Sequence, residues 1–171
     1  MVDFRYLKRK EWATLREVRL RALGESPEMF LATLSQESTY GRRKWRAEFK
    51  RGWWIVGLTS DGPVSLVGVT YASDEYRYYI EYMWVAPANR GSGIATNMLD
   101  FAFARLRRSG IHEIYLWILD GNEPASLLYK KKGFASNDVV HKLNEKKPGR
   151  TEEQLKLDLW HSSATNGPAG E

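Results

Sequence analysis

Cysteine is absent from the 171-residue sequence. A thiol nucleophile, a thiolate metal site and a disulfide bond are therefore excluded, and the absence fits a reducing compartment. The three histidines, at positions 112, 141 and 161, lie far apart and lack the spacing of metal ligands. We therefore expect no metal site.

Long hydrophobic runs are also missing. No apolar run approaches the length that spans a membrane, and the first ten residues (MVDFRYLKRK) contain no apolar segment of a secretory signal. We therefore expect a cytoplasmic protein without a membrane partner. The composition, 43% hydrophobic and 27% charged, is ordinary for a globular protein. The length suits a single domain with its own core.

The formal net charge is +5, but the basic residues fall into short clusters scattered along the chain. A dedicated nucleic-acid surface would usually gather such residues on one face or stripe. We therefore expect no nucleic acid as a partner, and a nucleic-acid-binding module is the last of the alternatives. A triply phosphorylated cofactor would account for part of the basicity equally well, and solvated helix faces account for most of the rest.

The N-terminal half predicts helices followed by antiparallel strands. Apolar residues recur at helical spacing, and aromatic or β-branched segments with turn residues between them indicate strands. We expect helices over residues 10–23 and 37–50, and strands over residues 4–7, 53–59, 64–71 and 76–85. In the last of these strands, simple alternation places Ile80 and Tyr82 on one face and Glu81 and Met83 on the other.

The C-terminal half changes to alternating helices and strands. A glycine-bearing loop at 86–93 precedes an amphipathic helix that ends near Gly110, and the apolar run at 113–119 is typical of a buried strand. The remaining elements are a helix from Asn122 to Gly133 and strands over residues 134–140 and 154–160. We expect a mixed α/β (α+β) fold in one domain, residues 1–160, with a mostly antiparallel sheet flanked by helices. The tail at 161–171 has the composition of a disordered segment.

The loop at residues 86–93 is the first candidate site. It follows a strand and opens a helix, where the first turn has unpaired N–H groups, the helix dipole is positive, and glycine lets the backbone approach an anion. It is neither a P-loop nor a dinucleotide fingerprint, because Gly-Lys-Ser/Thr and the three-glycine spacing are missing. The residues alone leave two interpretations open, an anion site or a tight turn of purely structural purpose.

Two blocks of sequence resemble the GNAT acetyltransferase superfamily. The first is the family pattern Gln/Arg-x-x-Gly-x-Gly/Ala, matched by Arg90, Gly93 and Ala95, with a Val-x-Pro upstream at Val85 and Pro87. The second is Asn-x-x-Ala-x-x-Leu-Tyr followed by Gly-Phe, which is matched by Asn122, Ala125, Leu128, Tyr129, Gly133 and Phe134. The resemblance covers residues 53–134 well and the termini in outline. It implies a fold in which the fourth and fifth strands splay apart.

The resemblance also implies acetyl-CoA as the cosubstrate. The CoA pyrophosphate would be held by the backbone amides of Arg90, Gly91, Ser92, Gly93, Ile94 and Ala95. The exposed strand edge from Met83 to Val85 would pair with the pantetheine amides as an extra strand does. Asn122 would contact the cosubstrate from the following helix, and a role as that helix's N-cap is compatible with the contact.

Acetyl transfer needs an amine that loses a proton, a stabilised oxyanion and a protonated leaving group. By resemblance, Tyr129 is the general acid near the sulfur, with plain packing as its alternative, and a backbone N–H near Val85 serves the oxyanion. Glu81 holds a strand position where several family members carry a catalytic glutamate, so it is the candidate base. The alternative for Glu81 is a structural interaction with Arg77 or Tyr79 on its own strand.

The acceptor is expected to bind between the first two helices and the loop that joins the last two strands. The candidate wall residues are residues 25–31, Trp45, Trp53, Tyr79 and Tyr82, and a carboxylate such as Glu25 or Glu28 would suit a cationic amine. Core aromatics and surface acids are the alternative for each of them. Some protein N-terminal acetyltransferases of the superfamily carry a base glutamate where this chain has Trp117, so that mechanism is not expected.

These observations predict an acetyl-CoA-dependent N-acetyltransferase that acts directly on the primary amine of a small molecule. One alternative is a protein or peptide N-acetyltransferase, which needs an open groove rather than a closed pocket. Another is an acyl-CoA-binding regulator without catalysis, against which the presence of Tyr129 and Glu81 argues mildly. The sequence leaves open whether the chain forms a homodimer.

Overall fold

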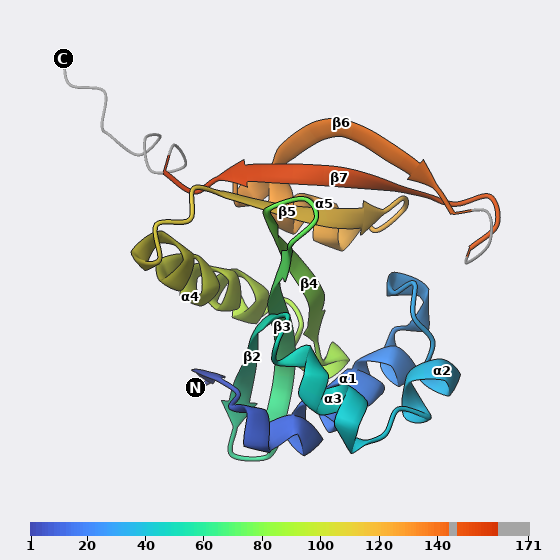
Figure 1. Cartoon of the computed structure of the whole chain (residues 1–171), viewed down its shortest axis with the longest axis vertical. Coiled ribbons are helices and arrows are strands. Elements are labelled where there is room, and N and C mark those ends of the chain that lie inside the picture. The colour runs from blue at the N-terminus through green and yellow to red at the C-terminus, as the bar shows by residue number, and fades with distance from the viewer. Residues whose placement is uncertain (144–146, 161–171) are drawn as a thin grey trace.

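The computed structural model describes residues 1–143 and 147–160 (Figure 1). Its helices are η1 (Arg9–Glu11), α1 (Trp12–Glu25), η2 (Pro27–Met29), α2 (Leu34–Ser38), α3 (Arg42–Glu48), η3 (Pro87–Asn89), α4 (Ile94–Arg108) and α5 (Glu123–Lys131). Its strands are β1 (Asp3–Tyr6), β2 (Gly52–Thr59), β3 (Gly62–Ala72), β4 (Arg77–Val85), β5 (Glu113–Leu119), β6 (Ala135–Lys142) and β7 (Thr151–Asp158). The predicted disordered tail at 161–171 lies outside the described residues.

The strands form one seven-stranded sheet in the order β1-β2-β3-β4-β5-β7-β6. β4 and β5 run parallel, and every other neighbouring pair is antiparallel. Helices α1 and α3 lie against one face of the first four strands, and α4 lies against the other (Figure 1). α5 shares its core with α4. The predicted fold, a mixed and mostly antiparallel sheet flanked by helices, is confirmed.

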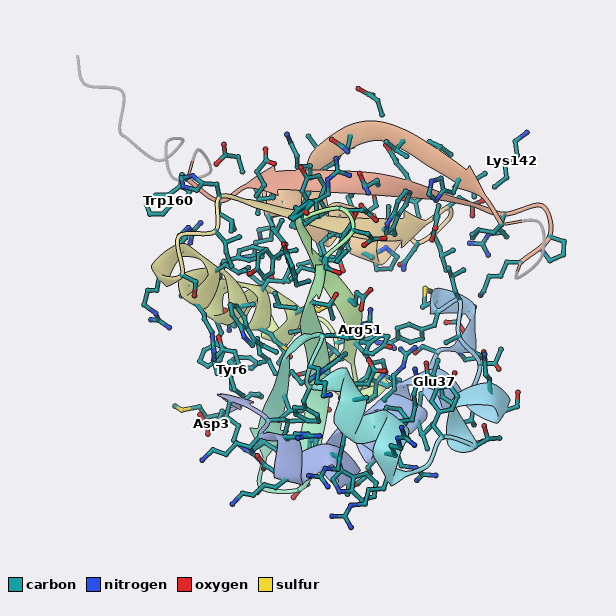
Figure 2. The ribbon with its side chains drawn as sticks, in the orientation of Figure 1. Asp3, Tyr6, Glu37, Arg51, Lys142 and Trp160 are labelled. Carbon is teal, nitrogen blue, oxygen red and sulfur yellow. The ribbon has the colours of Figure 1, made fainter. Side chains whose placement is uncertain are left out.

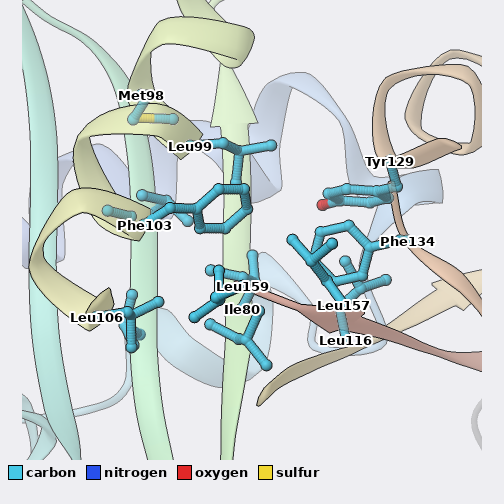
Figure 3. Packing of buried hydrophobic residues seen from close by; sticks show 14 of the residues in the cluster. Ile80, Met98, Leu99, Phe103, Leu106, Leu116, Tyr129, Phe134, Leu157 and Leu159 are labelled. Atoms are coloured by element: carbon cyan, nitrogen blue, oxygen red, sulfur yellow. The ribbon is translucent and has the colours of Figure 1, made fainter. Parts of the chain in front are cut away.

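Two apolar clusters hold the helices to the sheet. Beneath α4 and α5, the apolar face of α4 packs against β4, β5 and β7, as its helical spacing predicts (Figure 3). This cluster includes Ile80, Met98, Leu99, Phe103, Leu116, Tyr129, Phe134 and Leu157. On the other face, α1 and α3 pack against β2, β3 and β4 through a second cluster that includes Leu15, Val18, Trp45, Trp54 and Trp84.

The single helix predicted over residues 37–50 is wrong. The chain forms α2 up to Ser38 and α3 from Arg42, with a break between them. Gly41 is the N-cap of α3 and has an extended backbone, with φ −79° and ψ 172°, so a continuous helix cannot pass through it. The helical pattern on both sides was visible in the sequence, but the break depends on one non-helical glycine.

Strand β4 contains a bulge that the predicted alternation does not include. The register runs Gly68↔Glu81 and then Leu66↔Trp84, so β4 has one residue more than β3 in this stretch. Tyr82 takes up the extra residue with φ +57°, a left-handed conformation that is strained for a non-glycine residue. Ile80 consequently packs beneath α4 and Tyr82 packs beneath α1, although alternation predicts that they share a face.

The sheet opens between β4 and β5. Tyr79↔Tyr115 is the register pair that joins these two strands in the described part of the chain, whereas β5 pairs with β7 along its whole length. The predicted splay of the fourth and fifth strands therefore agrees with the structure. No helix of the described residues is long and apolar enough to cross a membrane.

Candidate active site

A cleft of about 680 Å³ lies where β4 and β5 separate. Its walls come from β4, β5, β7, the start of α5 and the segment that leads from α1 into α2. In Figure 2, Arg51 lies beside β4, and Glu37 lies on the side of the N-terminal helices. The ionisable residues in its lining are Arg19, Glu37, Tyr40, Arg51, Tyr79, Glu81, Tyr82, Tyr129 and Glu152.

The glycine loop at the start of α4 has the geometry that a phosphate group requires. Gly91 and Gly93 have positive φ values, 76° and 80°, and no heavy atom lies within 4 Å of the position that a β-carbon would take on either. Within the described ranges, the backbone N–H groups from Gly91 to Thr96 donate to no protein acceptor. Open space in front of unpaired N–H groups at a helix N-terminus fits a pyrophosphate. These residues therefore fit the CoA group that the sequence implies.

Arg90 differs from the other residues of that loop. Its backbone N–H already donates to the carbonyl of Pro87 at 3.3 Å. Its side chain donates from Nε to the carbonyl oxygen of Val85 at 3.0 Å and from Nη2 to Oγ of Ser26 at 2.7 Å. The Arg90 side chain therefore fixes the loop to the end of β4 and to the segment after α1. The carbonyl oxygen of Val85 accepts this one hydrogen bond and keeps a second lone pair for another donor.

Tyr129 lies on α5 at the boundary between the core and the cleft. Its side chain is 6% exposed, packs edge-on against Phe134 with ring centres 5.5 Å apart, and also lines the cleft. Figure 3 shows its hydroxyl oxygen on the side of the ring that faces Ile80. Burial raises the pKa of the Tyr129 phenol above its ordinary value, so the group keeps its proton at neutral pH. A protonated phenol at this point can donate a proton to a leaving group.

Glu81 lines the cleft from β4 and is paired with Arg51. Its carboxylate accepts a hydrogen bond from Arg51 Nη2 at 3.2 Å, and its side chain is 32% exposed. Arg51 Nη1 also donates to Glu48 at 3.0 Å, so one guanidinium serves two carboxylates. Burial lowers the pKa of Arg51, but the charges of Glu81 and Glu48 more than offset that effect. The structural partner of Glu81 is thus a residue next to β2 rather than Arg77 or Tyr79 of its own strand.

Asn122 is the N-cap of α5. Its side-chain oxygen accepts a hydrogen bond from the backbone N–H of Ala125 at 3.3 Å. It also lines the cleft, as does Met83 of β4. The cap and a contact to a bound ligand are compatible, because the cap uses only the oxygen of the amide.

Part of the predicted acceptor wall is found in the cleft. Tyr79 and Tyr82 line it, and so does the segment from Met29 to Leu31. Trp45 is instead buried in the core beneath α1, and Trp53 packs on the opposite face of the sheet near Arg105. The reason is that both tryptophans occupy positions whose side chains face a helix.

The predicted carboxylates Glu25 and Glu28 do not line the cleft. Glu25 forms an exposed ion pair with Arg21 at 3.0 Å. Glu28 contributes its backbone carbonyl, which accepts a hydrogen bond from Lys147 Nζ at 2.8 Å. The carboxylates that do line the cleft are Glu37, Glu81 and Glu152.

A buried ion pair between Arg19 and Glu37 was not predicted from the sequence. Nε and Nη2 of Arg19 donate to the two oxygens of Glu37 at 3.0 and 2.9 Å. The Arg19 side chain is only 2% exposed. The sequence did contain a signal, because Arg19 lies four residues after Leu15 and three before Ala22 and so falls on the apolar face of α1.

Trp117 and Glu152 are two further cleft residues for which the sequence predicted no role in binding. Trp117 of β5 stacks on His141 of β6, with ring centres 4.2 Å apart. Glu152 of β7 is opposite His141 in the register, and its carboxylate lies 3.6 Å from His141 Nδ1. The pairing of β7 between β5 and β6 brings these three side chains together, and nothing local in the sequence predicts that strand order.

Comparison with known proteins gives one family and several relatives. Residues 12–134 match the model of the acetyltransferase (GNAT) family. Streptothricin acetyltransferase of Streptomyces lavendulae is 32% identical over 82 residues, which are 47% of this chain and 43% of that protein. GCN5-related N-acetyltransferase 6, chloroplastic, of Arabidopsis thaliana is 43% identical over 56 residues, 33% of this chain and 19% of that protein. The matched segments thus span less than half of either relative.

Solved structures share the whole fold. The structure of yncA from Salmonella typhimurium with acetyl-CoA superposes with a TM-score of 0.72, covering 93% of this chain and 94% of that one at 19% sequence identity. At this identity the likeness bears on the fold alone.

Proposed function

Because the chain belongs to the acetyltransferase (GNAT) family, we propose that it uses acetyl-CoA as its cosubstrate and acetylates the primary amine of a small molecule. The observation that carries this proposal is the enclosure of the acceptor side of the cleft. Lys147, in the connection between β6 and β7, donates to the backbone carbonyls of Pro27 at 3.3 Å and Glu28 at 2.8 Å. This contact joins that connection to η2, whose Met29 lines the cleft. A walled cleft suits a small acceptor better than a folded protein or an extended peptide.

The glycine loop and the start of α5 would hold the cosubstrate. The unpaired N–H groups from Gly91 to Ala95 would bind the pyrophosphate, with Arg90 fixing the loop rather than contacting the anion through its side chain. The edge of β4 near Met83 would pair with the pantetheine amides, and Asn122 would contact the same molecule from α5. Acetyl-CoA supplies the activated acetyl group. Bound in this way, its thioester would lie in the gap between β4 and β5, beside Tyr129.

Two side chains would move the protons of the reaction. The acceptor ammonium gives a proton to Glu81, directly or through a water molecule, and the amine nitrogen then forms a bond to the thioester carbonyl carbon. A backbone N–H near Val85 stabilises the oxyanion. The carbon–sulfur bond breaks, and the phenol of Tyr129 gives its proton to the departing sulfur. The high pKa that burial imposes on Tyr129 supports this role, because the phenol stays protonated until a strong base forms beside it.

A screen of amines tests the proposal. The protein is incubated with acetyl-CoA and a library of small primary amines, with a set of short peptides tested in parallel, and the release of free CoA is followed. We expect turnover with a subset of small amines and none above background with peptides. Turnover with peptides alone would contradict the small-molecule proposal. Binding of acetyl-CoA without turnover on any amine or peptide would favour the non-catalytic regulator.

A further inference from the structure

We propose that the acceptor carries a second positive charge besides the amine that reacts, and that Glu152 and Trp117 bind it. This inference rests on the proposed function, because it concerns the acceptor of that reaction. It assigns a specificity subsite to the part of the cleft formed by β5 and β7, away from the Arg51–Glu81 pair on the β4 side.

The first argument is the charge balance of the cleft. Three carboxylates and two guanidinium groups line it. The charge of Arg19 is paired with Glu37 through two buried hydrogen bonds. Arg51 donates both to Glu81 and to Glu48, which does not line the cleft. The cleft therefore carries an excess of negative charge, although the whole chain has a formal charge of +5. A cleft with charge of one sign attracts ligands of the opposite sign.

The second argument is that Glu152 has no strong cationic partner within residues 1–143 and 147–160. Its ion-pair partner among the described residues is the imidazole of His141 at 3.6 Å, which carries a charge only when protonated. The Glu152 side chain is nevertheless only 13% exposed. Withdrawing a carboxylate from water is unfavourable unless a cation or several donors replace the water. A ligand ammonium that enters the cleft would supply both the charge and the donors.

The third argument is position. On β7, Glu152 and Gln154 point to the same face of the sheet, and Gln154 Nε2 donates to the hydroxyl of Tyr79 in the cleft wall at 3.1 Å. Trp117 is opposite Gln154 on β5 and stacks on His141. An indole ring beside a carboxylate is a common arrangement for binding an ammonium group, because the ring face and the carboxylate both attract it. Glu81 lines the same cleft from β4, which leaves β5 between the two glutamates.

Matched amines test the inference. The kinetics of putrescine and cadaverine are compared with those of butylamine and pentylamine, which have the same chains without the second amine. We expect kcat/KM for the preferred diamine to exceed that of its monoamine by about tenfold or more, which corresponds to one charge-assisted hydrogen bond. Glu152→Gln should lower kcat/KM for the diamine by about tenfold, through a higher KM for the diamine. It should leave kcat/KM for the monoamine and the KM of acetyl-CoA unchanged.

The matched control is Glu153→Gln. Glu153 is the next residue on β7 and points to the other face of the strand. It lines a smaller neighbouring pocket that shares Ile118, Leu119 and Asn122 with the cleft, but it is not itself in the cleft lining, so this variant removes the same charge from outside the cleft. We expect it to behave like the unmodified protein, and Glu152→Asp to keep most of the diamine preference. The inference is overturned if no diamine is preferred, if Glu152→Gln affects the monoamine and the diamine equally, or if Glu153→Gln has the same effect.

Calorimetry separates this inference from the proposed function. Each diamine and monoamine is titrated into the protein saturated with CoA, so that no turnover is needed. Diamine binding that Glu152→Gln weakens, without acetylation of any amine, would support the subsite and contradict the proposed reaction. Acetylation of amines with equal affinity for diamines and monoamines would support the reaction and contradict the subsite.

Discussion

The guanidinium carbon of Arg19 lies 3.9 Å from the centre of the Tyr82 ring, which belongs to the residue that forms the bulge in β4. A second ring, that of Phe30, lies 4.7 Å from the same carbon. The Tyr82 ring also stacks on Trp54 at 5.0 Å, where the absence of a β-carbon at Gly68 leaves room for the indole. The strained backbone of Tyr82 is thus held from one side by a buried ion pair and from the other by an aromatic stack.

We predict that Arg19→Met destabilises the protein by about 3 to 5 kcal/mol, because it leaves the carboxylate of Glu37 buried without its partner. The free energy of unfolding is measured by urea denaturation. Lys156→Met is the control, since it breaks the exposed pair with Glu113 and should leave the free energy of unfolding nearly unchanged. Equal losses in the two variants would contradict the importance of the buried pair.

Alkaline pH should destabilise the protein through Tyr82. Burial raises the pKa of Tyr82 to about 12 from its ordinary value of 10.0. Between these two values the unfolded chain has lost the phenolic proton and the folded protein has kept it, so stability is present below about pH 10 and falls as the pH rises towards about 12. We expect Tyr82→Phe to remove about 2 kcal/mol of this decline, measured as unfolding free energies at about pH 9 and about pH 11.5. An identical slope in both proteins would contradict the prediction.

Gly93→Ala should weaken acetyl-CoA binding by about tenfold or more, because the added methyl group enters the space in front of the free N–H groups. It should also cost about 1 kcal/mol of stability, since Gly93 has φ +80°. Gly110→Ala is a matched control: Gly110 follows the other end of α4, has φ +70°, and has equally open surroundings. Calorimetry with acetyl-CoA should give normal affinity for that variant, and a similar loss of affinity in both would contradict the phosphate site.

Tyr129→Phe should lower kcat by about 10²-fold while the affinity for acetyl-CoA stays the same. The reason is that the change removes the proton donor and keeps the ring that packs against Phe134. Steady-state kinetics gives kcat, and calorimetry on the same preparation gives the affinity for acetyl-CoA. If kcat is unchanged, Tyr129 has only a packing role.

Glu81→Gln and Arg51→Gln together distinguish a base from a structural partner. Each variant breaks the ion pair between the two residues, but only Glu81→Gln removes the carboxylate. If Glu81 is the base, Glu81→Gln should lower kcat by about 10²-fold or more, and Arg51→Gln by much less. Equal losses of kcat in the two variants would assign the whole effect to the broken pair.

Local motifs predicted the parts of this molecule that depend on neighbouring residues in the chain. The glycine loop, the helix that follows it and the N-cap at Asn122 each need only a short segment, and all of them are present in the structure. The splay of β4 and β5 came from the resemblance to a family rather than from the residues themselves. It agrees with the single register pair at Tyr79.

The acceptor side could not be predicted in the same way, because it depends on tertiary pairing. The bulge at Tyr82 puts Ile80 and Tyr82 on opposite faces of the sheet, and the consecutive residues 79–83 all line the cleft. Simple alternation along the sequence does not indicate where such a bulge falls. Glu152 and Trp117 meet only because β7 inserts between β5 and β6. Glu25 and Glu28 were plausible acids in sequence, but α1 and η2 direct them elsewhere.

Among the residues that the structure describes, Tyr79↔Tyr115 is the one register pair that joins β4 to β5. On the side of α4, the two halves of the sheet remain joined by the shared core. On the side of the cleft, they are bridged by Gln154 bonding to Tyr79 and by Lys147 bonding to the carbonyl of Glu28. Each such hydrogen bond contributes about 1 kcal/mol. The cleft can therefore widen to release an acetylated product by giving up a few side-chain contacts, without unzipping a strand.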